Sequence, residues 1–169
     1  MILNSEFQSG DLVFCHSKGF VGKSIRFIQH LHGDDDWEYN HVALLNEKQA
    51  NGDWAVIQAE AHGVTSDKLL SSVAPGGFYE VVALPQGVDR DKVLEFARAE
   101  VGCEYGFITI ASIVFTLWTP NAINVIKGNT WICSALAGEA LRAGGWIHKW
   151  PDVYQVRPAQ LLSALPATA

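Results

Sequence analysis

The sequence predicts an α+β fold in which a small antiparallel sheet packs on helices. Two apolar segments of strand length, residues 39–45 and 54–61, flank the turn sequence Asn51-Gly52-Asp53, an arrangement typical of a β-hairpin. Three further segments repeat apolar residues at three- and four-residue spacing, which indicates amphipathic helices. The chain has 169 residues and is 49% hydrophobic, enough for one sizeable core. We therefore expect a single domain over residues 1–169.

The amino-terminal part predicts a strand followed by a helix. A turn at Gly10-Asp11 precedes a short strand at residues 12–14. Residues 20–32 then show helical spacing of apolar side chains, and Gly33 with the three aspartates after it ends the helix. The hairpin strands follow, and they are expected to pair antiparallel.

The middle of the chain continues with short elements. Residues 66–72 predict a short helix or turn capped by Ser66. Residues 78–84 read as a third strand before Pro85, which extends the hairpin into a meander. Asp89 then opens an amphipathic helix that is expected to close at Gly102.

The carboxy-terminal part predicts helices and one edge strand. The apolar run 107–118 is about a dozen residues long, short of the roughly 20 that span a bilayer, so it is interpreted as a buried helix within the apolar segment 106–126. Residues 156–158 suggest an edge strand that ends at a proline. Residues 159–165 suggest a last short helix.

Cys133 opens another helix-like segment and is the candidate nucleophile. Small residues follow it, Leu136, Ala140 and Leu141 form an apolar face, and Gly144-Gly145 provides a carboxy-terminal stop. A thiol in the first turn of a helix lies at the positive end of the helix dipole, which favours the reactive thiolate. The alternative is a buried cysteine that only packs in the core.

His41 is the candidate general base, because an imidazole on an otherwise apolar strand needs a polar neighbour. If the hairpin turns near residues 49–50, His41 faces Gln58 directly and Glu60 diagonally. Either side chain can orient the imidazole, and Gln58 is the first choice. A histidine satisfied within the core is the alternative.

Charge and cysteine content exclude several classes. The net charge of −6 disfavours nucleic acid as a partner. Cys15, Cys103 and Cys133 form no CxxC pair, so no disulfide framework is suggested and a reducing compartment fits.

The first residues lack a signal-peptide pattern, and a cytoplasmic location without membrane insertion is expected. His30, His32 and the aspartates at 34–36 are interpreted as a solvated loop rather than a metal cluster.

The order of these motifs resembles the circularly permuted branch of the papain-like NlpC superfamily, which also holds the lecithin:retinol acyltransferase-like enzymes. The resemblance spans nearly the whole chain. It rests on Gly10-Asp11 before the first strand, on His41 in Tyr39-Asn40-His41-Val42, on Gly102-Cys103-Glu104-Tyr105 as a G-x-x-Y stretch, and on Cys133-Ser134. Residues 156–161 are similar to the closing segment of the family. The histidine precedes the cysteine, as in the permuted branch.

The resemblance implies a papain-like (permuted NlpC-type) α+β fold and a cysteine peptidase or amidase that needs no cofactor or metal. The implied substrate is a peptide or isopeptide amide, such as a cell-wall peptide, cleaved through an acyl-enzyme. Tyr105 and Ser134 are expected to line the substrate pocket. Gln58 stands where bacterial relatives tend to carry glutamate. Two alternatives remain: a lipid-type acyl hydrolase or acyltransferase, and a non-catalytic binding module. The oligomeric state is left open.

Overall fold

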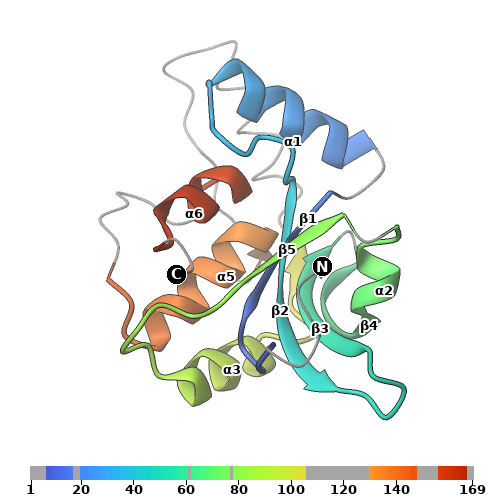
Figure 1. The fold of residues 1–169 in the computed structure, drawn as a ribbon, viewed down its shortest axis with the longest axis vertical. Coiled ribbons are helices and arrows are strands. Elements are labelled where there is room, and N and C mark those ends of the chain that lie inside the picture. Colours follow the sequence, from blue (N-terminus) through green and yellow to red (C-terminus); the bar gives the residue numbers. More distant parts are fainter. Residues whose placement is uncertain are drawn as a thin grey trace.

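A computed structural model describes residues 7–16, 20–60, 62–76, 78–105, 130–147 and 156–166. Its centre is a five-stranded sheet whose strands run in the spatial order β4-β3-β2-β1-β5 (Figure 1). Every neighbouring pair in this sheet is antiparallel. The strands are β1 (Leu12–Cys15), β2 (His41–Lys48), β3 (Trp54–Glu60), β4 (Gly63–Leu69) and β5 (Tyr79–Val82). The expected α+β class with a small antiparallel sheet is confirmed.

Helices cover both faces of this sheet. The described helices are α1 (Phe20–Leu31), α2 (Leu70–Val73), α3 (Arg90–Ala99), α5 (Cys133–Ala143) and α6 (Pro158–Ala164). Helix α5 packs against β2, β3 and α3, whereas α2 packs against β3 and β4 from the opposite side of the sheet (Figure 1). A separate two-stranded parallel sheet joins β6 (Glu104–Tyr105) to β7 (Thr130–Trp131), directly before α5.

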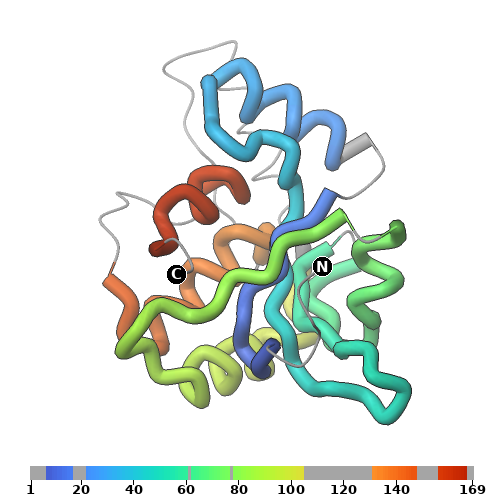
Figure 2. The backbone as a smooth tube through the Cα atoms, viewed as in Figure 1, coloured from blue at the N-terminus to red at the C-terminus, as the bar shows by residue number. Residues whose placement is uncertain are grey.

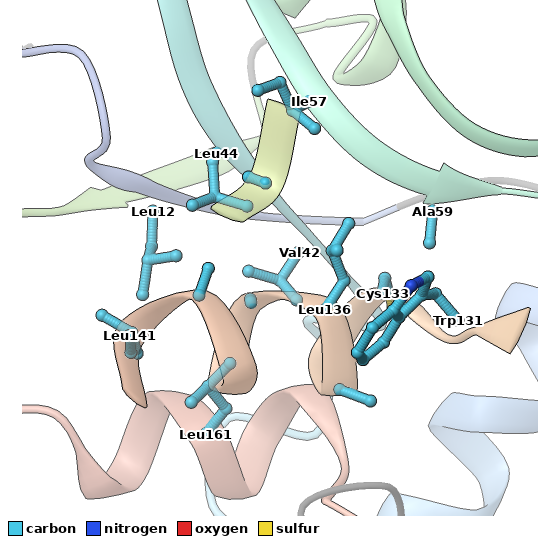
Figure 3. Packing of buried hydrophobic residues seen from close by; sticks show 14 of the residues in the cluster. Leu12, Val42, Leu44, Ile57, Ala59, Trp131, Cys133, Leu136, Leu141 and Leu161 are labelled. Carbon is cyan, nitrogen blue, oxygen red and sulfur yellow. The ribbon is translucent and has the colours of Figure 1, made fainter. Parts of the chain in front are cut away.

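Alternation along the strands divides the core between the two faces. Leu12, Val42 and Leu44 belong to the cluster that packs against α5, and Figure 3 shows them with Leu136 and Leu141 of that helix. Their neighbours along the strands point to the α2 side and form a second cluster. Because both faces are buried, the strands read as continuous apolar runs. Composition alone therefore does not show which side chains point to which face of the sheet.

Three helical predictions near the site are confirmed. Helix α1 ends at Leu31, one residue before the predicted end. Asp89 is the N-cap of α3, and its side chain accepts a hydrogen bond from the backbone N–H of Lys92. This helix ends at Ala99, before the predicted end at Gly102. Helix α5 begins at Cys133, and Gly144 is its C-cap residue. Within the described residues, no helix combines the length and apolar character needed to cross a membrane.

The prediction of a helix or turn at residues 66–72 is wrong for most of that segment. Strand β4 continues to Leu69, and only then does the four-residue helix α2 begin. Strand β4 lies at the edge of the sheet and carries Ser66, Asp67 and Lys68. Polar residues of this kind are common on edge strands, where they prevent pairing with other chains. Their polarity hid the strand in the sequence.

The expected antiparallel pairing of β2 with β3 is confirmed, but the expected extension of this hairpin by β5 is wrong. Strand β4 takes the place beside β3, and β5 pairs with β1 on the other side of the sheet, with Leu12 opposite Val82. Figure 2 shows these two segments side by side although they are far apart in the sequence. This placement comes from the long-range pairing, for which local sequence provides no signal.

The predicted edge strand at residues 156–158 is also wrong. Val156 and Arg157 precede α6 without strand pairing, and Pro158 is the first residue of the helix. Proline suits this position because the missing N–H would have no partner within the helix. The predicted last helix is therefore confirmed with its start one residue earlier. The predicted helical segment 106–126 lies outside the described residues.

Candidate active site

Cys133 is held at the start of α5 by the elements on either side of it. Strand β7 pairs with β6, and the indole N–H of Trp131 donates to the Glu100 carboxylate at 2.7 Å. Cys133 itself is only 3% exposed and belongs to the cluster between α5 and the sheet, as Figure 3 shows. The chain is thus fixed two residues before the sulfur.

Close packing brings α5 onto its neighbours. The residues from Cys133 to Leu141 are all buried, which requires small side chains wherever another element approaches. Gly144 shows how tight this packing is, because a Cβ there would lie 2.6 Å from a methyl group of Val93 on α3. The absence of a side chain at Gly144 therefore allows the end of α5 to approach α3 closely.

His41 begins β2 at the end of the sheet where α5 also begins. Its backbone pairs with Cys15 of β1, and its ring is bonded on both sides. Nε2 lies 2.7 Å from Oε1 of Gln58 on β3, and the ring also hydrogen-bonds the Cys133 side chain. Because a carbonyl oxygen only accepts, Nε2 carries its hydrogen toward Gln58, and Nδ1 is left for the sulfur.

The predicted strand register was wrong by two residues, although the predicted contact forms. Leu44 pairs with Ile57 and Leu45 with Val56, and an irregularity follows before Lys48. Counting from the first of these pairs, three residues back along β2 and three residues forward along β3, His41 falls opposite Glu60 rather than Gln58. The imidazole is long enough to reach Gln58 diagonally, as cross-strand side chains can. Gln58 is buried, and Glu60 is half-buried.

The interaction between Cys133 and His41 shifts the pKa values of both groups toward the ion pair. Burial raises the pKa of Cys133, but the His41 charge and hydrogen bond, together with the backbone N–H groups of Val42 and Ser134, lower it below its usual value of 9.0. Burial lowers the pKa of His41, but Cys133, Gln58 and the charge of Glu60 raise it above 6.5. The thiolate and imidazolium forms are therefore favoured together.

The pKa values of the other two cysteines are shifted in the opposite direction. Burial and then the nearby Cys133 charge raise the pKa of Cys15 to about 12. Partial burial raises the pKa of Cys103, as does its contact with Glu100, whose carboxylate oxygen lies 3.2 Å from the thiol sulfur. Both thiols thus favour the protonated form, in which sulfur is a poor nucleophile.

The remaining predicted residues occupy different surroundings. Glu60 acts on His41 through its charge. Ser134 is buried, and its hydroxyl donates to the Val156 carbonyl at 2.5 Å, while its backbone N–H faces the Cys133 sulfur. The backbone of Tyr105 pairs with Trp131 in the parallel sheet, and its side chain lies outside what the structure describes. The pocket roles of Tyr105 and Ser134 stay predictions.

Sequence reasoning missed a backbone donor to the sulfur and a carboxylate that holds the chain before Cys133. The backbone N–H of Val42 faces Cys133, and a backbone donor leaves no residue-type signal. The Glu100 carboxylate accepts hydrogen bonds from both the Trp131 indole N–H and the Cys103 thiol. It follows α3 in a stretch that reads as an ordinary charged helix end, so its role became visible only from the fold.

Comparisons with known proteins reveal a shared fold. No family model matches the chain, and no curated protein matches it in sequence. Among solved structures, it is similar to the metalloprotein yiiX, a DUF1105 protein from Escherichia coli O157:H7, with a TM-score of 0.56 and 19% identity. The similarity covers 81% of this chain and 66% of that chain, so this chain matches slightly less than two thirds of its neighbour's length.

Proposed function

We propose that the protein is a papain-like cysteine hydrolase of amide bonds, in which Cys133 is the nucleophile and His41 the general acid and base. The observation that carries this proposal is the Cys133–His41–Gln58 arrangement. A sulfur whose pKa is lowered contacts an imidazole whose pKa is raised, and an amide oxygen holds the far side of that ring at 2.7 Å. This is the nucleophile, base and orienting group that thiol acyl transfer needs.

In the first step, the Cys133 thiolate attacks the carbonyl carbon of the substrate amide. The new carbon–sulfur bond moves the carbonyl electron pair onto oxygen. The backbone N–H of Cys133, at the start of α5, is the proposed donor to this oxyanion, worth on the order of 3 kcal/mol when well aimed. His41 then transfers its Nδ1 proton to the amide nitrogen, the carbon–nitrogen bond breaks, and a thioester remains on Cys133.

In the second step, neutral His41 takes a proton from water as the water oxygen attacks the thioester. The carbon–sulfur bond breaks, the acid product leaves, and the thiolate–imidazolium pair forms again. Gln58 accepts the Nε2 hydrogen in both states of the ring. It therefore keeps Nδ1 directed at the sulfur without taking a charge itself.

The proposed family is the circularly permuted branch of the NlpC superfamily. Supporting it are the order of the motifs, with the histidine strand before the cysteine helix, and the placement of His41 on β2 beside Gln58 on β3. The proposed substrate class follows from that resemblance: a peptide or isopeptide amide, such as a cell-wall peptide.

A metal is not part of the proposal, although the neighbouring structure is described as a metalloprotein. Across the described residues, no group of three or more His, Cys, Asp or Glu side chains is placed to hold a metal ion. We therefore assign no step to a metal.

The proposal is tested by offering matched acyl-amide and acyl-ester substrates to the protein and following intact mass. We expect amide cleavage, an acyl adduct at Cys133, and loss of both in Cys133→Ala. Cys103→Ala is the matched control, because the Cys103 thiol lies against the Glu100 carboxylate, and it should retain turnover. Cleavage of esters alone would favour the lipid-type acyl hydrolase. Full amide turnover by Cys133→Ala would eliminate the mechanism.

A further inference from the structure

Gln29 is a polar residue at the centre of a buried contact among three elements. It lies in α1 and is 0% exposed. Its amide nitrogen donates to the carbonyl oxygens of Trp37 at 2.8 Å and Tyr39 at 2.9 Å. Its amide oxygen accepts from the backbone N–H of Ala159 at 3.1 Å. Both amide hydrogens and the oxygen are thus used, so the side chain has one well-defined orientation.

The two donated hydrogen bonds hold the segment that leads into β2. Tyr39 lies two residues before His41, and the backbone N–H of Asn40 between them donates to the Cys15 carbonyl at 3.2 Å. Gln29 and β1 together therefore fix the path of the chain directly before His41. A shift in this path would move the imidazole, because His41 is the first residue of its strand.

The accepted hydrogen bond leads toward Cys133. Ala159 lies in the first turn of α6, where its N–H has no partner within the helix, and Gln29 supplies one. The segment entering α6 is also bonded to the first turn of α5, because the Ser134 hydroxyl donates to the Val156 carbonyl. In Figure 1, α6 lies between α1 and α5.

A third contact strengthens this connection between α1 and α6. The Arg157 guanidinium donates to both carboxylate oxygens of Asp34, at 2.6 and 2.8 Å. Asp34 lies three residues after Leu31, the last residue of α1, and its backbone N–H donates to the carbonyl of Gln29. Residues 29–34 therefore bind both the loop before His41 and the segment that is bonded to Ser134.

We infer that Gln29 is a positioning residue for the proposed Cys133–His41 pair, joining the chain before His41 to the chain bonded beside Cys133. The inference rests on the proposed function for its catalytic consequence. Gln29 touches neither reacting group. It acts by fixing the relative position of the two segments that carry them, and a misplacement of about 1 Å in such a pair costs on the order of a hundredfold in rate.

Gln29→Met is the first test, because methionine has similar length and forms none of the three hydrogen bonds. We expect the pH profile of Cys133 alkylation to move its midpoint to higher pH, since a weaker His41 contact leaves the thiol less acidic. With a cleavable amide substrate, kcat should fall roughly tenfold or more while KM stays unchanged, because binding contacts are not removed.

Two controls separate positioning from general destabilisation. Gln49→Met makes the same substitution in the β2–β3 turn, where the amide forms an exposed 3.3 Å contact with the Glu47 carbonyl. It should leave the alkylation midpoint unchanged. Leu70→Ala removes a buried side chain on the α2 face of the sheet. It should lower the unfolding midpoint in denaturant without moving the alkylation midpoint.

Gln29→Glu is the second variant, and it preserves side-chain volume and the acceptor for Ala159. A carboxyl group has no NH2 group to donate to the carbonyl oxygens of both Trp37 and Tyr39, so this variant should also move the alkylation midpoint to higher pH. A folded variant of either kind with an unchanged midpoint and unchanged kcat would overturn the inference. The proposed function fails separately, if wild-type protein alkylates at Cys133 but cleaves no amide, and the effect of Gln29 on the midpoint remains measurable in that case.

Discussion

His41 has a different partner on each side of its ring, and this determines what each partner contributes. Cys133 exchanges the proton with the ring, and Gln58 accepts from Nε2 at 2.7 Å. Glu60 acts at longer range through its negative charge. The orienting function therefore requires the hydrogen bond of Gln58, whereas Glu60 adjusts the pH range in which the imidazolium persists.

Replacing each partner should separate these two contributions. Gln58→Ala removes the hydrogen bond and should lower kcat/KM roughly a hundredfold, because the imidazole loses its orientation. Glu60→Ala should lower kcat/KM by less than about threefold near neutral pH, because Glu60 is only half-buried and solvent weakens the effect of its charge. Steady-state rates of both variants on one amide substrate measure this. Equal and near-native rates would mean that neither residue orients His41.

The pH dependence of kcat/KM should be bell-shaped. The rate rises as Cys133 loses its proton, at a pH below the usual thiol pKa of 9.0. It falls when His41 loses its proton and can no longer protonate the leaving amine, above the usual imidazole pKa of 6.5. Both limbs belong to the coupled pair. Glu60→Gln removes a charge that raises the His41 pKa, so the alkaline limb should move to lower pH; an unmoved limb would contradict the electrostatic role of Glu60.

Residue identity predicted much of this site, and backbone geometry provided the rest. His41, Cys133 and Gln58 were recognisable because an imidazole on an apolar strand and a cysteine at a helix start are informative residue types. The strand register was predicted wrongly because the turn was expected near residues 49–50, whereas Lys48 pairs with Trp54 and the register shifts once more between Leu45 and Lys48. The N–H donors of Val42 and Ser134 carry no signal in the sequence at all.

Strand β4 has a second role, which is to anchor the chain that leads to Cys133. The backbone N–H of Val64 donates to the Cys103 carbonyl, and the N–H of Gly102 donates to the Val64 carbonyl, both at 2.9 Å. The chain leaving α3 is therefore docked on β4, and β6 is placed beside β7. Gly63 permits this approach, because a Cβ there would lie 2.5 Å from the Cys103 carbonyl oxygen.

Substituting Gly63 should test this docking. Gly63 has a φ of +107°, so Gly63→Ala combines backbone strain with the clash against Cys103. It should lower the free energy of unfolding by about 3 kcal/mol, of which roughly 1–2 kcal/mol is strain. Gly52→Ala is the matched control, since its φ is +86° and no atom lies within 4 Å of its added Cβ. Denaturant unfolding of both variants should show the larger loss for Gly63→Ala; equal losses would mean that the approach is not tight.

At this scale, local patterns predicted elements better than their pairing. Helices α3 and α5 were visible because capping residues and apolar spacing are local. Strand β4 was missed because its polar residues lie on an edge, and β5 was misplaced because its partner β1 is remote in the sequence. Glutamine is usually an exposed residue, so its type gives no signal that Gln29 is buried and bonded to α6.

On the scale of the whole molecule, the Arg157–Asp34 ion pair connects two segments that are far apart in the sequence. Arg157 and Asp34 are 123 residues apart, and their side chains are 17% and 10% exposed. The two parallel hydrogen bonds make this ion pair stronger than an exposed pair with a single contact. It joins α6 to the end of α1, on the side of the molecule where the chain enters β2.

Breaking this pair should therefore destabilise the fold more than breaking an exposed pair. Asp34→Asn leaves the Arg157 charge partly buried and should lower the free energy of unfolding by about 2 kcal/mol. The control is Lys92→Met, which removes a 3.6 Å contact between Lys92 and Asp89 and should change stability by less than about 0.5 kcal/mol. Thermal unfolding at low and high salt measures both. A loss no larger for Asp34→Asn than for the control would contradict a structural role for the pair.

The central claim, that Cys133 is an activated thiol, is tested most directly by the alkylation rates of the three cysteines at pH 7. Accessibility alone would favour Cys103, because it is the partly exposed one and Cys15 and Cys133 are buried. Thiolate content favours Cys133. With limiting iodoacetamide and peptide mass mapping, we expect Cys133 to react at least about tenfold faster than the other two and to lose this advantage in His41→Ala. If Cys133 reacts no faster than Cys15 or Cys103, the claim is wrong.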